Sequence, residues 1–62
     1  MDMIIGKHYH WKHDPHTKLV YTGRCPKTRI WHQFEKLKER GKVWCEVLGE
    51  DLRMLEPSKE GK

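Results

Sequence analysis

Four of the five histidines lie close together near the start of the chain, as His8, His10, His13 and His16. On an extended strand, His8 and His10 would share a face, and imidazole nitrogen is a good ligand for zinc, copper or nickel. However, neither cysteine belongs to a Cys-x-x-Cys pair, and no second ligand pair stands at the spacing of structural zinc sites. We therefore predict no metal site and no cofactor, with the imidazoles facing solvent.

Cys25 and Cys45 are the other candidates for chemistry. A disulfide between them would close a loop of 20 residues and stabilise the fold by about 3 kcal/mol, but only in an oxidising compartment. Cys45 alternates with Val43 and Val47, which predicts a buried thiol that packs as a small apolar group. Cys25 lies near Arg24, and a neighbouring positive charge lowers a thiol pKa.

No residue can be assigned as the base that would activate the Cys25 thiol as a nucleophile. The chain also lacks a glycine-rich phosphate loop, a nucleophile elbow and a pair of carboxylates with catalytic spacing. We predict that the protein is not an enzyme.

Aromatic side chains interspersed with basic ones are the strongest functional signal. If Val43, Cys45 and Val47 face the core, Trp44 faces outward, and an extended segment with Phe34 inward turns Trp31 outward. Exposed rings stack on bases or anchor protein interfaces, while basic side chains follow phosphates. Alternatively, the tryptophans simply cover a core that is too small to enclose them. The predicted binding residues are Trp31, Trp44, Tyr21, Arg24, Lys27, Arg29, Lys12 and Lys18.

The composition limits the class of protein. The 62 residues are 35% hydrophobic and carry 13 Lys and Arg against 9 Asp and Glu, and the net charge of +4 resides in residues 1–29. Such a chain forms one small domain, and its basic half favours an acidic partner. No apolar run is long enough to span a membrane, and residues 1–6 do not resemble a signal peptide. We expect a cytoplasmic protein without a membrane association.

Glycine and proline divide the chain into short segments, and alanine, the best helix former, is absent. We predict strands over about residues 3–12, 18–23 and 42–48, with a turn at 13–17 and a loop at 23–29. A turn at 49–51 and one helical turn precede a short last strand, so that the domain covers residues 1–56. Residues 57–62 are predicted to form a flexible polar tail.

Residues 30–40 fit two structures. Ile30, Phe34 and Leu37 have helical spacing, and Gly41 stands where a helix would end. The aromatic start of the segment and the lack of a capping box after Thr28 favour a strand instead. The fold is therefore mainly β, or else an α+β fold with a helix over about 30–40.

Several motifs together resemble one family. They are Gly6-Lys7-x-Tyr9-x-Trp11, Leu19-Val20-Tyr21-x-Gly23, Trp31-x-x-Phe34, Val43-Trp44-x-x-Val47 and Asp51-Leu52-x-x-Leu55-Glu56. This pattern is similar to the small SH3-like barrel proteins, in particular short members encoded by bacterial phages and prophages. The resemblance implies a strongly bent, five-stranded barrel with a one-turn helix before the last strand, in which Phe34 belongs to a strand.

The resemblance also implies a phage or prophage accessory protein in the cytoplasm of a bacterial host. It would dock on a host protein through Trp31, Trp44 and the basic loop at 24–29, as a monomer or weak homodimer. The alternative is single-stranded or duplex nucleic-acid binding by the same basic and aromatic surface.

Overall fold

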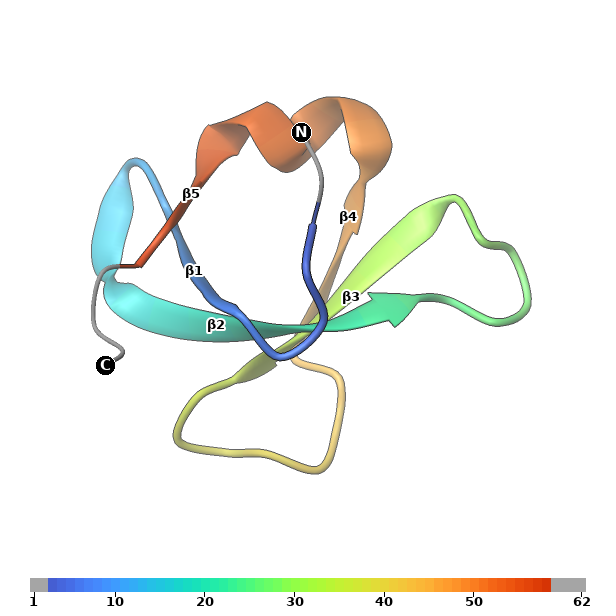
Figure 1. Cartoon of the computed structure of the whole chain (residues 1–62), viewed down its shortest axis with the longest axis horizontal. Coiled ribbons are helices and arrows are strands. Elements are labelled where there is room, and N and C mark those ends of the chain that lie inside the picture. Colours follow the sequence, from blue (N-terminus) through green and yellow to red (C-terminus); the bar gives the residue numbers. More distant parts are fainter. Residues whose placement is uncertain (1–2, 59–62) are drawn as a thin grey trace.

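Five strands and one short 3₁₀ helix make up the computed structural model, which describes residues 3–58 (Figure 1). The elements in chain order are β1 (His8–Trp11), β2 (Asp14–Arg24), β3 (Trp31–Lys36), β4 (Cys45–Leu48), η1 (Gly49–Met54) and β5 (Leu55–Pro57). All pairings are antiparallel, in one sheet of order β4-β3-β2-β1-β5. The prediction of a mainly β fold with five strands and a helical turn before the last is confirmed.

Residues 31–36, for which both a helix and a strand were considered, form strand β3. The alternative prediction of a helix over about 30–40 is therefore wrong. In β3, His32 and Phe34 are buried, while Trp31, Gln33 and Glu35 on the opposite face are partly exposed. This two-residue period is that of a strand. Strand β3 pairs with β2 on one side and β4 on the other, and these long-range partners satisfy the backbone groups that a helix would have paired internally.

The buried side chains of these strands pack around Phe34, which is fully buried and lies in the core. Its ring meets that of Tyr9 edge-on at 6.3 Å and that of Tyr21 at 5.3 Å between centroids. Such aromatic contacts add to the stabilisation from apolar burial. The buried cluster consists of Tyr9, Leu19, Tyr21, Phe34, Val47, Leu52 and Leu55.

The turn between the first two strands is shorter than predicted. It consists of residues 12–13, and Asp14 already belongs to β2, where it pairs with Trp11. The register shifts between His10 and Trp11, and residues 15–17 have no partner in β1. Pro15 can therefore lie inside a strand, because its missing N–H removes no bond from that pairing.

The start of the first predicted strand and the start of the predicted tail also need correction. Strand β1 begins at His8, while Gly6, at φ +89°, lies in a turn closed by the N–H of Lys7 on the carbonyl of Ile4. Pro57 pairs with Tyr9 in β5, and the N–H of Ser58 donates to the carbonyl of His8. The predicted polar tail thus does not begin at residue 57, and residues 59–62 lie outside the described part of the chain.

Candidate functional site

Trp31 and Trp44 lie at opposite ends of the β3–β4 pair. Trp31 opens β3 and pairs with Leu48, whereas Trp44 directly precedes β4 and donates its backbone N–H to the carbonyl of Phe34 at 2.7 Å. Trp31 and Phe34 are three residues apart along β3, so the backbones of the two tryptophans are separated by about 10 Å in the direction of the strand. The side chain of Trp44 is 52% exposed, so its predicted outward position is confirmed. Val43 is exposed too, because β4 begins only at Cys45, and its predicted core position is wrong.

The same ends of the β3–β4 pair carry further exposed apolar side chains. Ile30, directly before β3, is 60% exposed, and Val43 lies beside Trp44 at the other end. Strand β4 is an edge of the sheet, with no strand on its outer side among residues 3–58. We call this region the β3–β4 edge surface, which consists of the open side of β4 with Ile30, Trp31, Val43, Trp44 and Leu48.

The predicted basic loop adjoins the Trp31 end of this surface. The N–H of Cys25 donates to the carbonyl of Trp31, and the N–H of Arg29 donates to the carbonyl of Cys25, both at 2.8 Å. Arg29 has a positive φ of 62°. Arg24, Lys27 and Arg29 are all exposed, and residues 24–30 contain no carboxylate. The loop is therefore a positively charged projection, visible at the right of Figure 1 between β2 and β3.

Within the loop, the thiol of Cys25 has a pKa below its usual value. The causes are hydrogen bonds from the backbone N–H groups of Thr28 and then Lys27, followed by the Thr28 side chain. The direction is the predicted one, although hydrogen bonding rather than a neighbouring charge produces it. Cys45 shows the reverse, because burial raises its thiol pKa. Both cysteines are free thiols.

Tyr21 is a core residue, so its predicted place on a binding surface is wrong. Its side chain is 5% exposed, and its hydroxyl lies 2.8 Å from Nδ1 of His32, which is 8% exposed. Burial, and then the charge of Arg24, lower the pKa of His32. Leu19, Val20 and Tyr21 are buried in succession, although Val20 lies on the opposite face of β2 from its two neighbours.

The two remaining predicted lysines do not join the basic loop. Lys12 lies in the turn between β1 and β2, where its N–H donates to the carbonyl of Met54. Figure 1 shows this turn and the β2–β3 loop on opposite sides of the molecule. Lys18 is half-buried, and its Nζ donates to the carbonyl of Pro15 at 2.9 Å. The eight predicted residues therefore do not form one site.

Lys18 belongs instead to a pocket that the sequence did not predict. The N–H of Leu37 donates to the carbonyl of Lys18 at 3.0 Å, and this contact brings the first part of β2 beside the end of β3. The pocket between them has a volume of about 300 Å³. We call it the lysine pocket, and its lining residues are His16, Thr17, Lys18, Lys36, Leu37, Lys38 and Glu39.

The lysine pocket and the β3–β4 edge surface meet at Trp44, because Nζ of Lys36 lies 4.3 Å from the centre of its indole ring. Such a cation–π contact holds the ring in place from one side. The charged sequence from Lys36 to Arg40 gave no indication of a pocket. Nothing local indicated that it faces Lys18, which lies 18 positions before Lys36.

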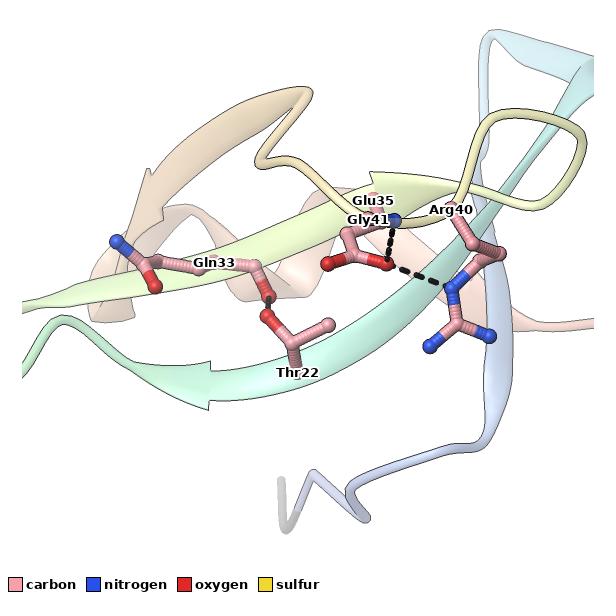
Figure 2. Close-up of polar contacts among 5 residues, drawn as sticks. All are labelled: Thr22, Gln33, Glu35, Arg40 and Gly41. Atoms are coloured by element: carbon pink, nitrogen blue, oxygen red, sulfur yellow. Dashed lines mark hydrogen bonds and ion pairs between the residues drawn. The ribbon is translucent and has the colours of Figure 1, made fainter.

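Glu35 fixes the loop at 37–44 that leads from the lysine pocket to Trp44. One of its carboxylate oxygens accepts hydrogen bonds from Nε of Arg40 at 2.6 Å and from the N–H of Gly41 at 3.0 Å (Figure 2). These bonds, with that of Arg40 foremost, lower the pKa of Glu35. Nearby, the hydroxyl of Thr22 donates to the carbonyl of Gln33 at 3.2 Å and links β2 to β3 (Figure 2). The loop is thus anchored to the sheet.

The four N-terminal histidines lie in β1 (His8 and His10), in the following turn (His13) and in β2 (His16). His10 is half-buried rather than facing solvent, since its Nδ1 lies 2.9 Å from the hydroxyl of Ser58 and its Nε2 lies 3.6 Å from a Glu56 oxygen. Within residues 3–58, no group of three His, Cys, Asp or Glu side chains is close enough to hold a metal ion. No helix in that part of the chain is long and apolar enough to cross a membrane.

Comparison with family models, with curated proteins and with solved structures finds no match to this chain. Its functional assignment therefore rests on the geometry of these surfaces.

Proposed function

We propose that the protein is a small, non-enzymatic binding module that docks on another protein through the β3–β4 edge surface and the adjoining basic loop. The observation that carries this proposal is the open edge of β4 between two exposed apolar ends, Ile30 on one side and Val43 with Trp44 on the other.

An open edge strand presents unpaired backbone groups, to which an extended segment of a partner can add as a further strand. Backbone hydrogen bonds give such a complex affinity, and side chains at its ends select the partner. Tryptophan is a frequent anchor of protein interfaces, which suits the exposed ring of Trp44. The charge of the basic loop favours a partner segment with acidic residues near the Trp31 end.

The resemblance to small SH3-like barrel proteins of phages and prophages supports a more specific proposal. The partner would be a host protein in the bacterial cytoplasm, and this chain would act as a phage or prophage accessory protein. A second copy of the chain could compete for the same edge, so we expect a monomer or a weak homodimer.

Nucleic-acid binding by this same surface has less support. The outer face between the two tryptophans carries Glu46, which accepts a hydrogen bond from Nε2 of Gln33 at 2.8 Å. A carboxylate at that place repels a phosphate backbone that would run from one ring to the other.

Affinity capture from bacterial lysate tests the docking function. The immobilised protein should retain a partner protein after nuclease treatment and at moderate salt, because apolar contacts are not screened by ions. Ile30→Asp and Trp44→Ala should each abolish this retention, whereas Met54→Ala, which changes an exposed apolar residue on η1, should preserve it. Retention that ends with nuclease, or that survives both surface variants, would contradict the proposal.

A further inference from the structure

The lysine pocket concentrates positive charge that the protein itself does not neutralise. Lys18, Lys36 and Lys38 line it together with a single carboxylate, that of Glu39. The ion pairs recorded within residues 3–58 are His10 with Glu56 and Glu35 with Arg40, so none of them involves these lysines. Amines held near one another favour an anion between them, because it offsets their mutual repulsion.

The pocket is formed from two segments whose positions are fixed. The N–H of Leu37 donates to the carbonyl of Lys18, and the N–H of Glu39 donates to the carbonyl of Lys36, both at 3.0 Å. Nζ of Lys18 is directed by its bond to the carbonyl of Pro15. The backbone of both segments is thus held by the sheet, which reduces the ordering needed when a ligand binds.

An aromatic ring lies beside this charge. Nζ of Lys36 is 4.3 Å from the ring centre of Trp44, and about half of the Trp44 side chain is exposed. Basic groups next to an exposed ring match the two parts of a nucleotide, since a phosphate binds amines while its base stacks on an aromatic face. An acidic peptide would use the lysines but has no planar base to place on the ring.

We propose that the lysine pocket is a binding site for the phosphates of single-stranded nucleic acid, with Trp44 as the stacking surface for an adjacent base. The proposal does not rest on the docking function, although both surfaces use Trp44. The pocket lies at the Trp44 end of β3, away from the basic loop, and uses Lys36 and Lys38 in addition to Lys18.

Titration of the ¹⁵N-labelled protein with an oligothymidylate of about ten nucleotides, a length within the usual site size of small single-strand binders, tests the location. The amide signals of Thr17, Leu37 and Lys38 and the indole N–H signal of Trp44 should shift together. Shifts confined to residues 24–30 would overturn the proposal, as would equal affinity for a poly-glutamate peptide of the same length.

Fluorescence anisotropy with the same oligonucleotide tests the individual contacts. Lys38→Glu should weaken binding by about fivefold or more, which corresponds to one lost ion pair in water. It should also make the slope of log K against log salt shallower by about 0.7, as for one phosphate contact on a single strand. Trp44→Ala should weaken binding by about fivefold to a hundredfold, and Trp44→Phe should restore part of it.

Lys27→Glu is the matched control, because it makes the same charge change in the basic loop. If Lys27→Glu and Lys38→Glu weaken binding equally, the oligonucleotide is attracted to the basic protein in general, and a specific pocket is refuted. The docking function is measured separately, since Ile30→Asp should leave oligonucleotide affinity unchanged and Lys38→Glu should leave nuclease-resistant capture unchanged.

Discussion

Replacing Tyr21 with phenylalanine should destabilise the fold through His32, the side chain that its hydroxyl contacts. The two groups lie 2.8 Å apart, and both are buried. The substitution keeps the ring that packs on Phe34 but leaves Nδ1 of His32 without its partner. A buried polar group left unpaired costs about 1–3 kcal/mol. In a domain of this size, each kcal/mol lowers the Tm by roughly 4–8 °C.

The same contact predicts how stability depends on pH. Burial, and next the charge of Arg24, lower the pKa of His32 in the folded protein. Between this lowered pKa and the ordinary histidine value of about 6.5, the unfolded chain binds more protons than the folded one. The free energy of unfolding should therefore fall as the pH drops below about 6.5, and this contribution should level off below the folded pKa.

Thermal unfolding followed by circular dichroism measures both effects. Tyr9→Phe is the matched control, because the Tyr9 hydroxyl accepts a hydrogen bond from the N–H of Ile4 and does not contact His32. It should leave the acid dependence unchanged, whereas His32→Leu should remove part of it. The reasoning is refuted if Tyr21→Phe melts like the wild type near neutral pH and His32→Leu keeps the full loss of stability in acid.

Four further perturbations test other parts of the structure. Trp44→Ala should change the free energy of unfolding by less than about 1 kcal/mol in a urea titration, because about half of the residue is exposed and it lies outside the buried cluster; a loss of several kcal/mol would place it in the core. Cys45→Ser should destabilise by about 1–3 kcal/mol, since the side chain packs against the core, and unchanged melting would contradict its position in β4. Near neutral pH, iodoacetamide should modify Cys25 before Cys45, because the pKa of the first thiol is lowered and that of the second raised; mass mapping of the opposite order would contradict the loop geometry. Glu35→Ala should speed amide hydrogen exchange at Gly41, whose N–H loses its acceptor, and exchange at the wild-type rate would mean that the carboxylate does not anchor the loop.

Val47 and Phe34 were placed correctly in the core because alternation along a strand is a local property. Trp44 lies outward as predicted, but it precedes β4, so alternation within that strand is not the reason. Val43 was placed wrongly, because alternation applies only within a strand and does not reveal that β4 starts at Cys45. The prediction of a turn over 13–17 was wrong for a related reason. An irregular pairing between β1 and β2 accommodates Pro15 inside a strand.

The candidate sites were less predictable than the strands. The sequence places basic residues in the N-terminal half, and the loop at 24–29 indeed carries several of them on its surface. Lys12 and Tyr21 were grouped with this loop by composition alone. The structure puts Lys12 in a distant turn and Tyr21 in the core, because the course of each strand, rather than closeness in sequence, decides which side chains meet.

By itself, the sequence determined a small, mainly β domain with a short helical turn before its last strand. These features follow from local alternation, turn residues and the lack of good helix formers. Only the tertiary structure decided that residues 31–36 form a strand, that His32 is buried on Tyr21, and that Lys18 faces Lys36 and Lys38. Each of these depends on the register between strands, which pairs residues far apart in the chain and cannot be read from either segment alone.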